Sequence, residues 1–278
     1  MTVEKFLHRK SLSQNFLVNR RILERIIDVC CLKDDETVLE IGPGQGALTW
    51  EIAKRVKKLI VIEKDERLIK ELEQIKEKAS FDHVTIIQAD ILRYPFDNLP
   101  ENLKVIGNLP YHIATPIIEK VIGIRNRCQD LYVMLQLEHG QRLMAKPHTK
   151  DYGSLSCFVQ YYTQPKMLFK IPNTAFSPRP KIESCFLHLK LLLEPVLKAN
   201  NEDILFKIIR QAFSQRRKMI QNSLESMISK NELAELFKRL NIDVKSRAED
   251  IKLEDYVRIA NDFIKSNLET NVGPISGD

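Results

Sequence analysis

Residues 37–49 read Thr37-Val38-Leu39-Glu40-Ile41-Gly42-Pro43-Gly44-Gln45-Gly46-Ala47-Leu48-Thr49. An apolar run leads into three alternate glycines, and apolar residues at helical spacing follow. Glycine permits tight turning and lets a ligand lie against bare backbone. The spacing is G-x-G-x-G, so the dinucleotide fingerprint G-x-G-x-x-G is not met. The pattern predicts a strand, a glycine turn and a helix, the unit with which ligand-binding α/β folds begin.

The next two strands are each expected to end near an acid. Residues 59–62 are apolar and lead into Glu63, 17 positions beyond Gly46, and the run 84–89 is followed by Asp90. A carboxylate at the tip of the second strand can bind ribose hydroxyls, and one after the third can accept from an adenine amino group. Each acid could instead cap the helix that follows, a role for which Asp65 competes with Glu63.

The fourth strand leads into Asn108-Leu109-Pro110-Tyr111, after the apolar run 104–107. The Asn108 side-chain oxygen can accept from an N–H group, Pro110 stiffens the turn, and Tyr111 offers a face for stacking. Together they suit the binding of a flat ring that bears an amino group. The alternative is an ordinary Asn-x-Pro turn.

Alternating strands and helices up to a fifth strand at 131–137 predict a parallel sheet with right-handed crossovers. The runs 167–171 and 184–193 are joined by a short link, so we expect an antiparallel pair that closes the sheet. This arrangement suits the Rossmann-like class I methyltransferase fold and departs from the dinucleotide oxidoreductases. Residues 1–195 are therefore expected to form the α/β domain, and residues 196–278 a small all-α domain.

In the second domain, apolar residues at helical spacing predict one helix that runs from Leu205 past Phe213 to Leu224. Arg216 and Arg217 would then border its apolar stripe. Their stems could lie along the core with the charged heads in water. Alternatively, they could face the cleft between the domains as phosphate or base contacts.

The net charge of the 278 residues is +6, and it is unevenly distributed. Residues 1–25 hold six basic and two acidic residues, residues 140–193 hold eight and two, and residues 200–278 are neutral overall. Two clusters of one sign are compatible with a solvated face or with a surface that follows a phosphate backbone.

No apolar run approaches the ~20 residues of a membrane span, and the first ten residues lack the apolar segment of a secretory signal. We therefore expect a cytoplasmic protein without a membrane partner. Five cysteines without a C-x-x-C pair predict reduced thiols and no metal site.

The motifs in this order resemble the rRNA adenine dimethyltransferase family, in particular its bacterial KsgA type, which acts on small-subunit (16S) rRNA. The resemblance spans nearly the whole chain and is carried by Gln14-Asn15-Phe16-Leu17, Glu40–Gly46, Glu63, Asp90, Asn108–Tyr111, Phe176-Ser177-Pro178-Arg179-Pro180-Lys181 and Gln211–Lys218.

The resemblance implies S-adenosylmethionine as the cofactor, S-adenosylhomocysteine as its product, and no metal. The cofactor contacts it implies are Asn15, Leu17, Gly42, Gly44, Glu63, Asp90 and Asn108. The segment 1–20 thereby becomes part of the cofactor pocket, which composition does not show.

The implied reaction places two methyl groups on N6 of each of two adjacent adenines near the 3′ end of small-subunit rRNA, within an immature subunit. The residues implied to hold the target adenine are Asn108, Leu109, Pro110, Tyr111 and, on its other face, Phe176. The expected RNA contacts are Arg9, Lys10, Lys146, Lys150, Arg179, Lys181, Arg216, Arg217 and Lys218. We expect a monomer.

Three rival functions share some of these features. The large-subunit rRNA adenine methyltransferases have the same cofactor motifs and Asn-Leu-Pro-Tyr, but the 146–153 loop and the 215–218 region favour the small-subunit type. A non-catalytic assembly factor is disfavoured by the intact Glu63, Asp90 and Asn108. A nicotinamide oxidoreductase is disfavoured by the glycine spacing and the closing antiparallel pair.

Overall fold

The computed structural model describes residues 15–271 and the side chains of residues 15–265. The chain divides into two compact units, one made of residues up to Gly140 with Gln164–Leu193, the other of Gln141–Thr163 with residues from Glu194 onward. Residues 141–163, expected in the α/β domain, therefore group with the C-terminal helices. The physical reason is aromatic packing, because Phe158 and Tyr162 both lie against Phe206 with ring centroids 5.3 and 5.7 Å away.

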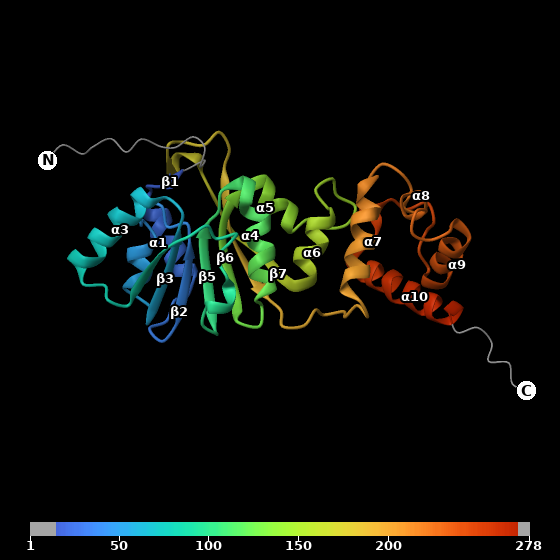
Figure 1. The fold of residues 1–278 in the computed structure, drawn as a ribbon. Coiled ribbons are helices and arrows are strands. Elements are labelled where there is room, and N and C mark those ends of the chain that lie inside the picture. Colours follow the sequence, from blue (N-terminus) through green and yellow to red (C-terminus); the bar gives the residue numbers. More distant parts are fainter. Residues whose placement is uncertain (1–14, 272–278) are drawn as a thin grey trace, which may run out of the picture. The chain divides into compact units, whose positions relative to one another are not determined.

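The first unit is built on a sheet of seven strands in the order β4-β3-β2-β5-β6-β9-β7 (Figure 1). The strands are β2 (Thr37–Ile41), β3 (Lys58–Glu63), β4 (Val84–Gln88), β5 (Leu103–Asn108), β6 (Cys128–Gln136), β7 (Thr163–Ile171) and β9 (Ser184–Leu191). Strands β4, β3, β2, β5 and β6 pair in parallel. Strand β9 runs antiparallel to β6 and lies between β6 and β7. The predicted class I methyltransferase sheet with its closing antiparallel strand is confirmed.

The strand order reverses at β2. The chain moves from β2 outward through β3 to β4, then returns to β5 on the other side of β2. Ile41 pairs with both Ile62 and Gly107, so the ends of three strands lie at one level. Open α/β sheets bind ligands in the crevice at such a reversal. The glycine turn, Glu63 and Asn108 all follow directly from these paired residues.

The helices of the first unit include α1 (Arg20–Val29), α2 (Thr49–Ala53), α3 (Glu66–Ala79) and α4 (Tyr111–Gly123). Helix α1 is capped by Asn19, whose side chain accepts from the Ile22 amide at 3.1 Å. Helix α4 begins at Tyr111, directly after the turn at Asn108-Leu109-Pro110. Pro110 precedes it without a side-chain cap, so the usual sequence signal for a helix start is missing.

A second, two-stranded sheet pairs β1 (Phe16–Leu17) with β8 (Phe176–Ser177) in antiparallel fashion. Phe16 faces Ser177 and Leu17 faces Phe176, while the Val18 amide donates to the Ala175 carbonyl at 2.9 Å. Two segments about 160 residues apart in the chain are thus joined. The N-terminal segment is held against the loop that carries Phe176.

The second unit is helical. Its elements are α6 (Ser154–Tyr162), α7 (Glu202–Ser214), α8 (Ile220–Leu224), α9 (Lys230–Leu240), the short 3-10 helix η4 (Ala248–Asp250) and α10 (Leu253–Asn271), and α5 (Leu137–Leu143) ends inside it. The single helix predicted through Leu224 is wrong, because α7 ends at Ser214. The amide of Ile220 donates instead to the Ser246 carbonyl at 2.8 Å, and Met219 forms an isolated antiparallel β-bridge with Arg247. These tertiary hydrogen bonds compete with helix continuation, so Arg216 and Arg217 do not lie on a helical stripe.

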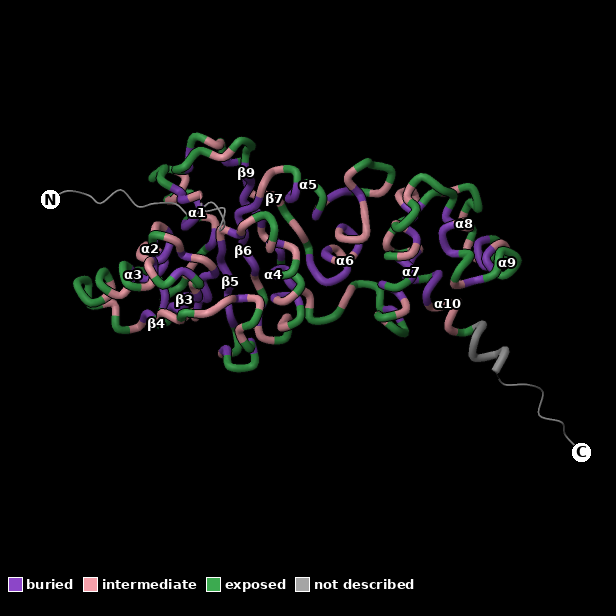
Figure 2. The backbone as a smooth tube through the Cα atoms, turned by 45° about the horizontal axis from the view of Figure 1, so that its top comes forward, coloured by how far each residue is buried: buried purple, intermediate pink, exposed green. Residues whose placement is uncertain are grey.

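Buried residues concentrate in the strands, whereas α3 is largely exposed along its outer face (Figure 2). The strands β2, β3 and β5 consist almost entirely of buried residues, as expected for a parallel sheet covered on both faces. Within residues 15–271, none of the helices combines the length and apolar composition that a membrane span requires.

The glycine turn gives a stability prediction. Gly46 has φ +82°, and a Cβ there would lie 2.6 Å from the Trp50 indole nitrogen and 2.9 Å from Leu72. Gly46→Ala should lower the free energy of unfolding by about 2 kcal/mol, because left-handed backbone costs an L-residue roughly 1–2 kcal/mol before any clash. Urea denaturation measures the change. As a control, Gly123→Ala at the end of α4, where nothing lies within 4 Å, should be neutral or stabilising; equal losses in both variants would contradict this account.

Candidate active site

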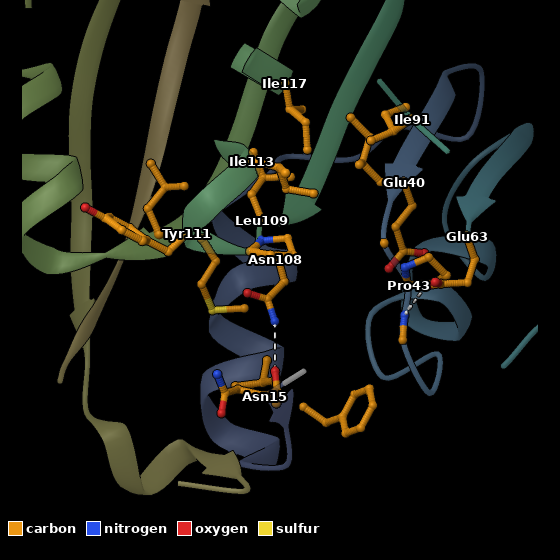
Figure 3. Close-up of a pocket in the computed structure, with 18 of the residues that line it drawn as sticks. Asn15, Glu40, Pro43, Glu63, Ile91, Asn108, Leu109, Tyr111, Ile113 and Ile117 are labelled. Atoms are coloured by element: carbon orange, nitrogen blue, oxygen red, sulfur yellow. Dashed lines mark hydrogen bonds between the residues drawn. The ribbon is translucent and has the colours of Figure 1, made fainter. Parts of the chain in front are cut away.

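A cavity of about 430 Å³ opens at the carboxyl ends of the parallel strands. Its volume is within the range of small-molecule sites. In Figure 3, Asn108 and Leu109 lie on one side of it, and Glu40, Pro43 and Glu63 on the other. The cavity brings together every predicted cofactor and adenine residue: Asn15, Leu17, Gly42, Gly44, Glu63, Asp90, Asn108, Leu109, Pro110, Tyr111 and Phe176 all line it.

The glycine turn forms one wall with left-handed backbone. Gly42 and Gly44 have φ values of +67° and +59°. A Cβ on Gly44 would lie 2.8 Å from the Phe16 ring, so the turn and the N-terminal segment are in close contact. The sequence predicted glycine here so that a ligand could approach the backbone. The structure shows that the Phe16 side chain also lies against this backbone.

Glu63 accepts three backbone hydrogen bonds at the end of β3. The amides of Lys64 and Asp65 donate at 2.8 and 2.9 Å, and that of Gly44 at 3.3 Å across the turn. Burial raises the pKa of its carboxyl, although these amides act in the opposite direction. The question of the helix cap is settled, since Asp65 caps α3 by accepting from the Arg67 amide. Glu63 is therefore not the helix cap, and its Oε2, which accepts only the Gly44 amide among these three, has room for a further donor.

Asp90 follows β4 and is already engaged in two interactions. Its Oδ1 accepts from the Leu92 amide at 3.0 Å, and its Oδ2 from the Lys64 ammonium at 2.9 Å. The hydrogen bond from Lys64 is the main reason that the pKa of this carboxyl lies below its usual value. Sequence reasoning missed Lys64, because a lysine after Glu63 gives no sign that it reaches the next strand.

Asn108 has a fixed side-chain orientation. Its amide nitrogen donates to the Asn15 backbone carbonyl at 3.2 Å (Figure 3). Because only the nitrogen can donate to a carbonyl, this hydrogen bond assigns the two ends of the amide and leaves Oδ1 as an acceptor on the other side. The Leu109 amide donates to the Met134 carbonyl at 3.1 Å, which ties the turn to β6.

Tyr111 is 55% exposed at the start of α4. Its ring meets His139 edge to face, with centroids 5.7 Å apart. His139 is buried, and its Nε2 lies 3.3 Å from the Thr115 hydroxyl. The exposed ring thus rests on a buried support that sequence reasoning missed. Phe176 lines the same cavity but is only 5% exposed and packs in the core, so Tyr111 is the more accessible stacking face.

Glu40 is a further cavity residue, which the sequence motifs included but to which they assigned no role of its own. It is 2% exposed and lines the cavity, and its Oε2 has no hydrogen-bond partner. Burial raises the pKa of this carboxyl to about 8, with the Thr49 hydroxyl opposing and the Glu63 charge reinforcing the shift. A buried polar atom that lines a cavity and has no hydrogen-bond partner fits a site for a polar ligand.

The expected RNA contacts divide between the two units. Arg179 and Lys181 are exposed in the first unit, and the Arg179 Nε donates to the Asn173 side chain at 2.9 Å. Arg9 and Lys10 lie outside the described residues. In the second unit the side chains of Lys146, Lys150, Arg217 and Lys218 are exposed.

Arg216 has a different environment from its neighbours. Its Nε donates to the Glu249 carboxylate at 2.6 Å, and its Nη2 to the Thr149 carbonyl at 3.1 Å. The His148 amide donates to the Glu249 carbonyl at 2.8 Å. Arg216 therefore fastens the 146–151 loop to η4 within the second unit. It neither lays its stem along a helical core stripe nor presents an unpaired charge.

All five cysteines are free, and Cys31 alone among them is exposed. Within residues 15–271, no group of three or more His, Cys, Asp and Glu side chains is placed to hold a metal ion.

The chain matches the ribosomal RNA adenine dimethylase family over residues 5–265. It belongs to this family. The family predicted from the sequence motifs is therefore confirmed, and with it an S-adenosylmethionine-dependent rRNA adenine dimethyltransferase activity.

Named relatives and solved structures agree with this assignment. The chain is 37% identical to ribosomal RNA small subunit methyltransferase A of Alkaliphilus oremlandii, covering 94% of this chain and 93% of the relative. It is 40% identical to the protein of the same name from Moorella thermoacetica, covering 91% of each. The 23S rRNA methyltransferase ErmE has a similar structure, with a TM-score of 0.69 at 25% identity, over 88% of this chain and 98% of that one. A dimethyladenosine transferase from Plasmodium falciparum has the same fold, with a TM-score of 0.81 at 23% identity, over 90% and 98% of the two chains.

Glu40 gives a prediction of pH dependence. Its folded-state pKa of about 8 lies above the ordinary 4.5, so the folded protein binds a proton that the unfolded chain releases between these values. The free energy of unfolding should therefore fall as pH rises from about 4.5 to 8, by a few kcal/mol on the order-of-magnitude scale of such shifts. In Glu40→Gln most of this decline in the free energy of unfolding should disappear. The decline that remains should come from Glu63, whose pKa is also raised. Urea denaturation at pH 5 and pH 8 tests this; equal declines in both proteins would contradict it.

Proposed function

We propose that the protein transfers methyl groups from S-adenosylmethionine to N6 of two adjacent adenines in the 3′-terminal hairpin loop of small-subunit rRNA, giving N6,N6-dimethyladenine. The observation that carries the proposal is a single cavity in which Asn108–Tyr111 meet Glu63 and Asp90. The relatives named for the small subunit match this chain at 37–40% identity over more than nine tenths of its length, which supports this choice of substrate.

The cavity fits S-adenosylmethionine in its donor and acceptor groups. Glu63 would hold the ribose hydroxyls, Asp90 the adenine amino group, and the glycine turn with Asn15 and Leu17 the rest of the molecule. The unpartnered Glu40 oxygen supplies an additional buried hydrogen-bonding group. When bound, this cofactor supplies a methyl group on a positively charged sulfur and leaves as S-adenosylhomocysteine.

Asn108 aims the target nitrogen. The lone pair of an adenine N6 is delocalised into the ring, which makes it a poor nucleophile. The Asn108 Oδ1 and the Leu109 carbonyl would accept the N6 hydrogens and favour a pyramidal nitrogen, whose lone pair then points at the methyl group. The Asn15 carbonyl holds the Asn108 amide in this orientation from behind.

Positioning is the main contribution of the remaining residues. Pro110 stiffens the turn, and Tyr111 stacks on the adenine with its ring supported by His139. Correct placement of two reactants can supply ~7 kcal/mol or more of barrier reduction. No strong general base is needed, because a methylated N6 is acidic while it is cationic.

The RNA is proposed to bind through charge and through an extruded base. The target adenine must leave its stack to enter the cavity, which costs least in a hairpin loop. Arg179 and Lys181 in the first unit, and Lys146, Lys150, Arg217 and Lys218 in the second, are exposed and would contact phosphates. We further propose that the protein acts as a monomer, in the cytoplasm, on an immature small subunit.

One experiment tests the substrate. The protein is incubated with labelled S-adenosylmethionine and, in separate reactions, immature small subunits, large-subunit rRNA or DNA, and the methylated base is identified after digestion. We expect N6,N6-dimethyladenine in small-subunit rRNA alone. Label in large-subunit rRNA would establish the rival specificity, and no label in any substrate would favour a non-catalytic assembly factor.

Asn108→Ala serves as the matched inactive variant in this assay. It should lower turnover on the order of a hundredfold or more, as the loss of one preorganised polar group does in other active sites. Binding of S-adenosylhomocysteine should weaken only modestly. Near-normal turnover would show that Asn108 does not aim the target nitrogen.

The two neighbouring arginines should respond differently to substitution. Arg217→Ala removes an exposed charge, so the slope of log affinity for RNA against log salt should become shallower by roughly 0.7–0.9 per lost contact, while the melting temperature is unchanged. Arg216→Ala leaves Glu249 without its partner, so the melting temperature should fall, and its salt slope should change less than that of Arg217→Ala. The reverse pattern would make Arg216 the RNA contact.

A further inference from the structure

Lys64 stands where a purine amino group is expected to bind. Asp90 has two carboxylate oxygens, and both already accept hydrogen bonds, one from the Leu92 amide and one from the Lys64 ammonium. Under the proposed function, Asp90 receives the adenine amino group of the cofactor. The free protein therefore carries its own cation on the acceptor that the cofactor needs.

The Lys64–Asp90 pair belongs to the cavity and not merely to the surface around it. Both residues line the cavity with Glu63 and Ile91. Lys64 comes directly after Glu63 at the end of β3, and Asp90 follows β4, the neighbouring strand. The ammonium thus spans the two strand ends between which the adenosine part of the cofactor would lie.

The exposure of the two side chains makes the pair easy to open. The Lys64 side chain is 63% exposed and that of Asp90 is 26% exposed. Exposed ion pairs contribute little net stability, because water solvates both charges well when they separate. The lysine ammonium can move into water, whereas the Leu92 amide is fixed in the backbone and keeps Oδ1 in place.

We propose that Lys64 is a specificity-determining residue of the cofactor site: it occupies Asp90 in the free protein and is replaced there by the exocyclic amino group of the cofactor's adenine. This inference rests on the proposed function. Cofactor affinity is then set by an exchange at Asp90, and the lysine lowers it. An unsubstituted purine linked through N9 has no N–H donor with which to replace the ammonium.

The test is calorimetric binding of S-adenosylhomocysteine to the whole protein and to Lys64→Met, which keeps the length of the stem and removes the charge. At low salt the variant should bind S-adenosylhomocysteine about twofold to fivefold more tightly. This fold-change corresponds to the free energy that an exposed ion pair contributes. Raising the salt concentration should strengthen binding to the wild type relative to the variant, because salt weakens the competing pair.

Two further variants make the result specific. Lys70→Met removes a lysine that pairs with Glu66 on α3 at the same 2.9 Å and is 70% exposed, and it should leave affinity unchanged. In an Asp90→Asn background, Lys64→Met should lose most of its effect, because the two residues act through one interaction.

Each outcome bears on a different claim. Unchanged or weaker binding to Lys64→Met, with the wild type binding normally, would overturn the exchange and leave the proposed function standing. An equal gain in Lys70→Met would assign the effect to net charge and also overturn it. No binding of S-adenosylhomocysteine to the wild type would instead overturn the proposed function, and the inference with it.

Discussion

Strand β2 pairs in parallel with both β3 and β5, and the position of the cavity side chains depends on that pairing. Ile41 is in register with Ile62 and Gly107, so the next residues along the three strands emerge together. Glycine at position 107 allows β2 and β5 to lie this close, since a Cβ there would be 3.1 Å from the Ile41 carbonyl. The glycine turn, Glu63 and Asn108 become neighbours because backbone hydrogen bonds fix the level at which the strands end.

The N-terminal segment completes the site from outside the sheet. Phe16 and Leu17 pair with the segment at Phe176, and the Asn15 carbonyl receives the Asn108 amide. One wall of the cavity and the orientation of the Asn108 amide are thereby coupled through three residues of extended chain. The coupling explains how a short segment before the first helix comes to line the cavity.

Some charged side chains at the two predicted binding surfaces form ion pairs with other residues of the protein when no ligand is bound. Lys64 neutralises Asp90 in the cavity, and Arg216 is held by Glu249 in the second unit. A positive residue near a binding surface is therefore not automatically a contact. Arg217 and Lys218 remain exposed, so neighbours in one basic run can have distinct roles, one structural and the others open to a phosphate.

The sequence predicts the sheet class, the strands that carry Glu63 and Asn108, and the family, because buried strands and glycine turns leave strong local patterns. It also places Glu63, Asp90 and Asn108 at one edge of the sheet, since the carboxyl ends of parallel strands meet there. Asn15, Leu17 and Phe176 are named only through the family resemblance. The tertiary structure alone decided that Arg216 binds Glu249, that α7 stops at Ser214, and that residues 141–163 belong with the C-terminal helices. It also placed Lys64 on Asp90, and His139 beneath Tyr111. These depend on partners far apart in the chain, for which local propensity and periodicity carry no signal.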